Sequence, residues 1–570
     1  MNECIKLQIF PIRKLKKSFY NALFLIDIVF PASYLAAMRL LISLVEAILL
    51  LSGAGSMEEL EESELERFEM LAEHPVCINM APVGRLRSCG LFSEYQLASL
   101  QDYIARTGDI LSAVELGTVP GFTQELAGAL RFFISFESHS PAGTRHREHI
   151  RQELMLRDVL RDGSRAFSGK YHLQYGESME LYLSAKDKAT GSVSLYGKRP
   201  WKLVLGDFNA RFGQGLLSWS GFSLSGFSTI SAFCRNASGI SGTGSFSPSG
   251  RGLAAGYEGR SWNAASALNA DGRLLCSVSW LGRSGNAGVN AVVGRDCPGM
   301  SLDWKKAFGH LNLFGEVAYA GKPAFLAGAR WEPAYKISAA LLVRCYTAGY
   351  AAAYAGAARS ASKVADETGL AAGVQIRWFS ATADLAVHPG RMAERKNNYE
   401  QFKSVVSAAP EFRSGGWVLS PVLKWTERMQ LSPDGEAFKA EWRNDLRCDL
   451  KAAKGGLQGT LRLNCVQVSG KSPGGLGYFE IGYKTPSDTA RLQWSVFARG
   501  TVCRTDGWAS RIYAYERDVP GAFNVPAWYD RKSGASLVAS ISSRHKRYRH
   551  RLNLRLSTKD FKIQYQLWIY

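Results

Sequence analysis

The 570-residue sequence predicts a mainly β protein, a large antiparallel transmembrane β-barrel preceded by a small all-α segment. The first observation is the end of the chain, where apolar side chains occupy every second position from Phe561 to Ile569. A period of two places alternate residues on opposite faces of a β-strand. The second observation is that similar alternation recurs through residues 141–570. The third observation is an abundance of residues that suit turns and aromatic girdles, with 56 Gly, 14 Trp, 23 Tyr and 28 Phe.

Individual strands can be assigned along this region. We expect the first around Glu148–Arg157, followed by strands at Tyr171–Leu183 and Trp201–Phe212. Later segments alternate more cleanly, and they begin near Leu311, Trp417, Leu457, Leu492 and Leu552. We expect about 16–20 strands, an even number as in single-chain bacterial barrels. The last strand should pair with the first, because a free edge strand promotes aggregation.

Charge and cysteine content narrow the function classes. The formal net charge is +19, and many of the basic residues fall on the polar faces of the predicted strands, which accounts for part of the charge without nucleic acid. The ten cysteines include no Cys-x-x-Cys pair and no Cys/His cluster with zinc spacing, so we expect no metal and no cofactor. Cys448 and Cys465 could pair across adjacent strands, although isolated thiols are the simpler interpretation.

Residues 1–56 are predicted to be an export segment. Met38-Arg39 precedes an apolar run, Leu40–Leu51, and small residues at Ser52–Ala54 suit signal-peptidase cleavage. Met38 is a candidate true start, because a basic stretch and another apolar run lie before it. A retained N-terminal membrane anchor is the alternative.

Residues 57–140 are predicted to be helical. Met57–His74 carries eight glutamates and an apolar stripe that includes Leu60, Leu65 and Phe68. We expect this acidic helix to be solvated and packed on its neighbour.

Two helix–turn–helix units follow within residues 75–136. Their turns contain Leu91-Phe92-Ser93 and Gly121-Phe122-Thr123. With Ile78–Ala81, this segment resembles the tandem helix-hairpin-helix domain of competence-type DNA receptors. The resemblance implies that the six turn residues contact a DNA phosphate through backbone N–H groups.

This copy departs from the family pattern in both turns. Leu91 and Ser93 stand where glycines are favoured in the first turn, and Thr123 replaces the second glycine of the second. Residues 75–136 hold four arginines and five acidic residues, a net charge of −1. Since phosphate neutralisation dominates DNA affinity, a plug-like or protein-interaction role is favoured over DNA binding.

The combined features resemble helix-hairpin-helix domain-containing barrel proteins of Bacteroidetes-type bacteria. The tracts Leu205–Gly221 and Asp518–Ala527 look like signatures of that family. The resemblance implies an outer-membrane location, contact with outer-membrane lipid, an N-terminal domain in the periplasm and a periplasmic protein partner.

A candidate lumen constriction lies in the first tract. Asp207, Asn209 and Arg211 have strand spacing and share a face, and Gln214 follows them. An internal salt bridge in the wall is the alternative. Glycines at 213 and 215 interrupt the alternation, and we expect a turn inward or a long loop reaching about Gly250.

The leading functional hypothesis is a non-enzymatic barrel with a role in passage or assembly. A DNA-uptake or DNA-binding receptor is the alternative. Gly470–Gly474 fits the pattern of a serine nucleophile elbow around Ser472, but Pro473 and the glycines indicate a loop between strands, so we predict no enzyme.

Overall fold

The computed structural model describes residues 44–570 except 61, 139–149, 198–199, 221–225, 246–249, 260, 283, 295–297, 335, 395–397, 435–436, 486–490 and 546. Most of the export segment, residues 1–43, thus lies outside the described residues, as does the start of the predicted first strand. Residues 44–570 form one compact unit that contains both the helices and the barrel. Among the described residues, no helix is both long and apolar enough to cross a membrane.

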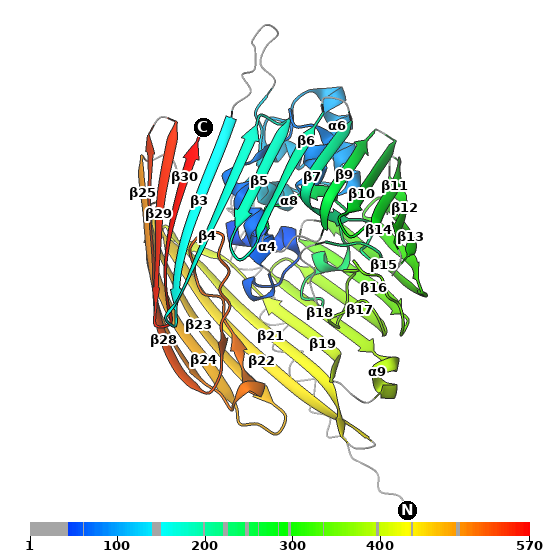
Figure 1. The fold of residues 1–570 in the computed structure, drawn as a ribbon. Helices are drawn as coiled ribbons and strands as arrows, with labels where there is room; N and C mark the ends of the chain where they lie inside the picture. The colour runs from blue at the N-terminus through cyan, green and yellow to red at the C-terminus, as the bar shows by residue number, and fades with distance from the viewer. Residues whose placement is uncertain are drawn as a thin grey trace, which may run out of the picture. The chain divides into compact units, whose positions relative to one another are not determined.

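A closed antiparallel β-barrel dominates the structure, as predicted (Figure 1). The strands of the first half of its wall are β3 (Ile150–Arg161), β4 (Ser164–Tyr175), β5 (Met179–Ala185), β6 (Ala189–Tyr196), β7 (Trp201–Arg211), β9 (Gly250–Glu258), β10 (Trp262–Asn269), β11 (Leu274–Gly282), β12 (Gly285–Val293), β13 (Gly299–Phe308), β14 (Leu311–Ala320) and β15 (Lys322–Ala334). The second half comprises β16 (Ile337–Tyr346), β17 (Glu367–Ile376), β18 (Phe379–Val387), β19 (Tyr399–Ala408), β21 (Trp417–Asp434), β22 (Ala437–Lys454), β23 (Leu457–Val468), β24 (Gly474–Lys484), β25 (Leu492–Arg504), β28 (Arg531–His545), β29 (Tyr548–Ser557) and β30 (Asp560–Ile569).

The last strand closes the barrel on the first, which confirms the predicted closure. Gln152 of β3 pairs with Ile569 of β30, and the antiparallel register runs on to Arg161 and Asp560. The closed wall has 24 strands, so the expected count of about 16–20 was too low. Strands such as β10 and β12 carry many small side chains, which weakens the hydrophobic alternation that marks a strand. The predicted strand at 171–183 also proved to be a hairpin of β4 and β5.

The two faces of the wall have opposite chemistry. On β23 and β24, Leu461, Leu463, Phe479 and Ile481 are 42–54% exposed on the outside, whereas Arg462 and Glu480 between them are buried. An apolar outer band with a polar interior is the pattern of a transmembrane barrel. The alternation that predicted the strands thus separates the membrane face from the lumen.

The N-terminal helices pack with the barrel. They are α3 (Leu44–Ser52), η1 (Met57–Glu59), α4 (Glu62–Glu73), α5 (Val83–Ser88), α6 (Glu94–Thr107), α7 (Ala113–Leu116) and α8 (Gln124–Leu130), with the short parallel pair β1 (Val76–Cys77) and β2 (Ile134–Ser135) tying their ends together. Figure 1 shows α4 and α8 in blue within the ring of strands.

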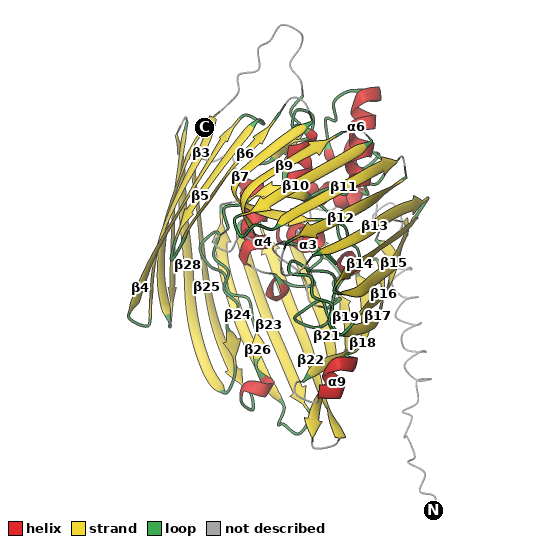
Figure 2. Ribbon diagram, turned by 45° about the vertical axis from the view of Figure 1, so that its right-hand side comes forward, coloured by secondary structure: helices red, strands yellow, loops and turns green. Residues whose placement is uncertain are grey.

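Inward-folding loops occupy further space inside the ring (Figure 2). The region after β7 contains η2 (Ile230–Phe233) and β8 (Gly239–Gly242), and it meets the segment between β16 and β17. Trp219 N, for example, donates to Tyr354 O at 2.8 Å. The region between β25 and β28 contains η3 (Trp508–Ser510), β26 (Ile512–Tyr513) and β27 (Ala527–Trp528). The remaining elements are β20 (Phe412–Ser414) and α9 (Pro389–Glu394).

Candidate functional site

The acidic stretch around η1 and α4, residues 57–73, is held by charges on the barrel wall; we call it the lumen helix. At its start, Glu58 accepts hydrogen bonds from Arg462 at 2.6 Å and from Arg447 at 3.1 Å. Arg447 lies on β22 and Arg462 on β23, and both also bind the buried Asp449. The expectation of a solvated helix is wrong, because described glutamates such as Glu58 face basic side chains of the inner wall rather than water.

The rest of the lumen helix is bound from other sides of the barrel. Glu73 at its end pairs with Arg549 and Arg551 of β29, both at 3.0 Å. Glu66 pairs with Lys170 of β4 at 2.6 Å. Partners on β4, β22, β23 and β29 surround the helix, so it lies inside the lumen.

These ion pairs keep several glutamates ionised despite burial. Burial itself raises the pKa of the Glu58 carboxyl, but Arg447 and Arg462 outweigh it and hold that pKa well below its ordinary value. For Glu59, Lys424 and Lys403 together with hydrogen bonds overcome burial and lower the pKa to about 2. The helix is therefore docked as a set of anions against cations.

Inward-folding loops complete the enclosure of the helix. Ser228 Oγ, in the region after β7, donates to Glu59 at 2.9 Å. In the region between β25 and β28, Tyr515 N donates to Glu58 at 3.1 Å and Gly521 N donates to Glu69 at 2.5 Å. Gly521 lies in the tract Asp518–Ala527, and Arg211 of the tract Leu205–Gly221 lies 3.6 Å from Glu64. Both tracts singled out in the sequence thus contact the lumen helix.

In α5, which follows the lumen helix in the chain, the helix supplies the positive charges and the barrel supplies the negative ones. Arg85 of α5 pairs with Glu177 at 2.5 Å and Glu180 at 3.0 Å, and Arg87 pairs with Glu258 of β9 at 2.6 Å. Both arginines are at most 5% exposed. Two of the four arginines in the segment 75–136 are thus engaged by the barrel.

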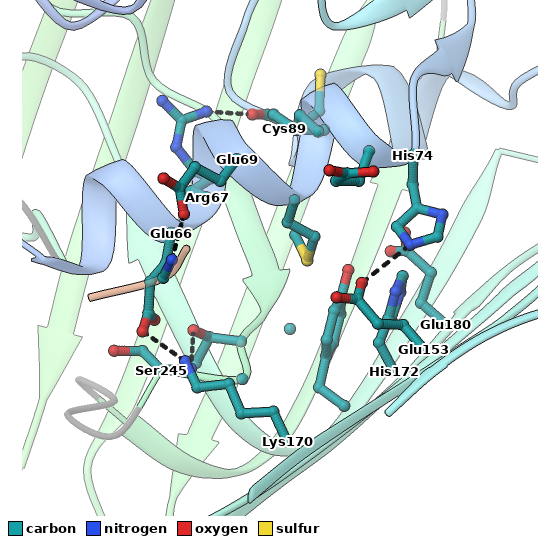
Figure 3. A pocket seen from close by; sticks show the side chains of 18 of the residues that line it. Glu66, Arg67, Glu69, His74, Cys89, Glu153, Lys170, His172, Glu180 and Ser245 are labelled. Atoms are coloured by element: carbon teal, nitrogen blue, oxygen red, sulfur yellow. Dashed lines mark hydrogen bonds and ion pairs between the residues drawn. The ribbon is translucent and has the colours of Figure 1, made fainter. Parts of the chain in front are cut away.

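A cavity of about 390 Å³ lies beside the lumen helix (Figure 3). Lys170, His172 and Tyr182 of β4 and β5 line it, together with Glu153 of β3 and His74 at the end of the helix. Burial is the main cause that raises the pKa of Glu69, another lining residue, to about 7.

The six hairpin residues serve the packing and capping of the helices. Leu91, Phe92 and Phe122 are at most 6% exposed. Ser93 caps α6 by accepting from Gln96 N, and Thr123 caps α8 by accepting from Leu126 N. These two hydroxyls therefore satisfy N–H groups at the helix N-termini. Gly121 has a positive φ of 90°, as its turn requires.

The four residues of the predicted constriction do not form one group. Asn209 and Arg211 line the cavity, and Arg211 Nε donates to Ser220 O at 2.9 Å. Asp207 instead pairs with Arg251 on β9 at 2.7 Å, and Gln214 bonds to the backbone of Arg235. Gly206, which precedes Asp207 within β7, has a φ of +94°. The predicted inward loop after Phe212 is confirmed by the contacts of Ser228 and Trp219 given above.

The basic residues that hold the helix were not recognised individually in the sequence. Lys424, Arg447, Arg462, Arg549 and Arg551 each lie on the polar face of a strand. The available signal was the combination of basic polar strand faces with one strongly acidic helix. Ser472, which the sequence predicts to lie in a loop rather than in a nucleophile elbow, lies in the turn between β23 and β24. All eight cysteines in the described part of the chain, Cys448 and Cys465 among them, are free thiols.

No protein-family model and no curated protein matches the sequence. Among solved structures, the P pilus usher (PapC) translocation pore matches with 10% identity and a TM-score of 0.28, covering 74% of this chain and 98% of that one. The outer membrane protein OpdK from Pseudomonas aeruginosa has 9% identity and a TM-score of 0.28, with the same coverages. OccK10 (OpdN) from Pseudomonas aeruginosa has 8% identity and a TM-score of 0.29, again covering 74% and 98%. The likeness concerns the barrel fold alone.

Proposed function

We propose that this protein is a non-enzymatic outer-membrane barrel for passage, closed at rest by its own lumen helix. The observation that carries the proposal is the ring of ion pairs around residues 57–73. Glu58, Glu66 and Glu73 find basic partners on different strands of the inner wall. A helix held in this way blocks the lumen.

Displacement of the helix would expose a basic channel. Arg447, Arg462, Arg549, Arg551 and Lys424 would then face water rather than glutamates. Rings of basic side chains favour anions in pores, so the species that passes should be anionic. The trigger would be a periplasmic protein that engages the helical segment, where Leu111 and Val114 are 65% and 59% exposed.

The DNA-receptor alternative has less support. The hairpin N-termini are capped by Ser93 and Thr123, and Arg85 and Arg87 are bound to wall carboxylates. Two of the four arginines of residues 75–136 are therefore not available to neutralise phosphates. Binding of duplex DNA tighter than about micromolar at physiological salt by the full chain in detergent would reverse this ranking.

Conductance of the reconstituted protein tests the passage role. The variant Glu58→Lys/Glu73→Lys places cations against the wall arginines at both ends of the helix, and we expect it to conduct several-fold more than the wild type, with anion selectivity. Asp102→Lys is the matched control, because Asp102 is 59% exposed on α6 and, among the described residues, its ion pair is with Arg106 on its own helix. An assembled Glu58→Lys/Glu73→Lys barrel with wild-type conductance would contradict the proposal.

A further inference from the structure

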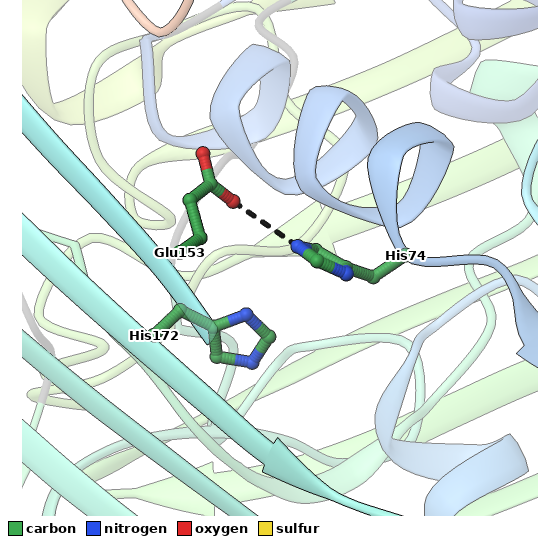
Figure 4. Close-up of side chains that lie close together, drawn as sticks. All are labelled: His74, Glu153 and His172. Carbon is green, nitrogen blue, oxygen red and sulfur yellow. Dashed lines mark hydrogen bonds and ion pairs between the residues drawn. The ribbon is translucent and has the colours of Figure 1, made fainter. Parts of the chain in front are cut away.

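Three side chains with metal-ligand chemistry meet at one wall of the cavity (Figure 4). His74 follows α4, Glu153 lies on β3 and His172 on β4. His74 Nε2 is 3.1 Å from Glu153 Oε2, and one ligand atom from each residue lies within 4.8 Å of the other two. The residues are far apart in the sequence, which is why a search for local spacing did not find them.

Two ring nitrogens in this group have no hydrogen-bond partner among the described residues. They are Nδ1 of His74 and Nε2 of His172. His74 is only 4% exposed and His172 only 8%. Since buried polar atoms are normally paired, an unpaired buried nitrogen calls for an explanation, and an ion is one.

Neighbouring residues orient two of the three ligands, Glu153 and His172. Glu153 and His172 are directly opposite in the register of β3 and β4. Tyr182 stacks on His172 with a centroid distance of 4.5 Å and an angle of 3° between the rings. Gln566 Nε2 donates to Glu153 Oε1 at 3.2 Å, which leaves Oε2 facing His74. Such outer contacts orient ligands at metal sites.

We propose that His74, Glu153 and His172 bind a divalent transition metal, with Zn²⁺ as the best match. Imidazole and carboxylate are typical zinc ligands, and three protein ligands leave one position open. A tetrahedral site with metal–ligand distances of about 2.1 Å has ligand atoms about 3.4 Å apart. The widest separation in the group must therefore shorten by at most about 1.4 Å, which side-chain rotation supplies.

The charges around the cavity permit a cation there. Its lining includes as many carboxylates as basic side chains, so a dication does not meet a positive surplus. The carboxylates are Glu66, Glu69, Glu73, Glu153 and Glu180, and the basic residues are Arg67, Arg85, Lys170, Arg211 and Arg551. The open coordination position faces this cavity.

The metal would fasten the lumen helix to the wall. His74 ends the helix, whereas Glu153 and His172 belong to the first two strands of the barrel. Binding to the closed arrangement alone stabilises it by mass action. This clamp is separate from the ion pairs behind the passage role, and it would persist if the barrel had another function.

Cobalt binding tests the site directly. The full chain is purified without an oligohistidine tag, stripped with chelator and titrated with Co²⁺. We expect one equivalent to bind with the visible absorption of a four-coordinate cobalt, and His74→Gln and His172→Gln each to weaken binding by at least about tenfold. Heat-modifiable gel migration checks that each variant is folded, and Glu153→Gln replaces any variant that is not.

His388→Gln is the matched control. His388 is fully buried, but its Nδ1 lies 2.7 Å from Asp366 O. Within the part of the chain that the structure describes it belongs to no metal-ligand group, so this variant should bind Co²⁺ like the wild type. Zn²⁺ should also slow hydrogen exchange in α4 relative to chelator, and His172→Gln should abolish the difference. Absence of stoichiometric Co²⁺ binding, or binding that persists in His74→Gln and His172→Gln, would overturn the proposal.

Discussion

Near β14–β17 the wall meets the inward loop mainly through apolar side chains, beside a buried ion group of Arg344, Glu367 and Asp384. Near β21–β29 the wall meets the lumen helix through charges. In the first region, Phe227, Ile230 and Phe233 of the inward loop pack on Leu326 and Leu342 of the wall, and all are at most 3% exposed. In the second, the lumen helix and the wall meet through carboxylates and guanidinium groups. The same barrel thus closes its two sides with different interactions.

The difference indicates which side can open. Separation of the apolar contacts exposes hydrocarbon to water at a cost of about 25 cal/mol per Å². Separation of an ion pair returns both partners to water, and the recovered hydration offsets much of the lost attraction. The charged side can therefore open as a unit with a small net increase in free energy. Removal of one partner alone is strongly destabilising, because it leaves a buried charge unpaired.

Arg462→Ala should have the largest effect on the charged side. It removes one of the two arginines that bind both Glu58 and Asp449 and leaves Arg447 to hold the two carboxylates. Removal of one member of a buried pair costs about 3–5 kcal/mol. Faster hydrogen exchange in α4 would measure this loss as a lower free energy of local opening.

Two controls accompany Arg462→Ala. Arg106→Ala removes an arginine that is 66% exposed and pairs only within α6, so α4 should exchange as in the wild type. In the double variant Glu58→Gln/Arg462→Ala, part of the lost protection should return, because one buried charge is gone. Equal exchange in Arg462→Ala and Arg106→Ala would show that the ion pairs do not hold the helix.

Phe233→Ala should produce a slightly smaller effect on the apolar side. Phe233 is 1% exposed and contacts Phe227 with a ring-centroid distance of 5.0 Å. We expect a cost of about 3 kcal/mol, at the low end for Phe→Ala because a loop can relax into the space. Hydrogen exchange of residues 226–234 should report it, while α4 stays protected. A loss of protection in both segments would mean that the two sides open together.

The pH dependence of opening on the charged side should follow two glutamates of the lumen helix, Glu59 and Glu69. The lowered pKa of Glu59, about 2, means that its contribution is present above its ordinary pKa of 4.5 and is lost as the pH falls toward 2. The raised pKa of Glu69, about 7, has the opposite sign: its contribution is full below pH 4.5 and is lost as the pH rises through 7. Protection of α4 should therefore be greatest near pH 5.

Glu69→Gln separates the loss of α4 protection at acidic pH (the acid limb) from the loss near neutral pH. Glu69 faces Arg157 of β3 and the carboxylates of Glu66 and Glu73, besides the amide of Gly521. An amide in its place removes the decline between pH 5 and pH 7 and leaves the acid limb intact. Protection of α4 that still declines over this range in Glu69→Gln would assign the decline to another group.

The fold followed from the sequence because its main signal is local. Alternation around Leu461, Leu552 and Phe561 is a property of single strands, and closure follows from the need to pair the edges. The strand number was underestimated where Ala/Gly-rich strands such as β10 carry similar small side chains on both faces. A period of two cannot be detected there from hydrophobicity.

The candidate site followed only in part. Its components were visible as an acidic helix, a basic balance and two sequence tracts, but their contact was not. Glu58 meets Arg462 across 404 positions in the chain, and such a pairing depends on the closure of the whole barrel. The group of His74, Glu153 and His172 was missed for the same reason.

Thr123→Ala should give the smallest effect, because Thr123 belongs neither to the apolar contacts of the inward loop nor to the charged contacts of the lumen helix. Thr123 Oγ1 accepts from Leu126 N at 3.1 Å and caps α8, so its loss should cost about 1 kcal/mol. The faster exchange should be limited to the first turn of α8, because the contacts of the lumen helix described above do not involve this hydroxyl. Thr118→Ala is the control, since Thr118 is also exposed and its hydroxyl donates to Glu115 O in α7 rather than capping α8. If Thr123→Ala instead loosened α4 as Arg462→Ala is expected to do, the hairpins would be part of the closure, and the helical segment would have to open as one body.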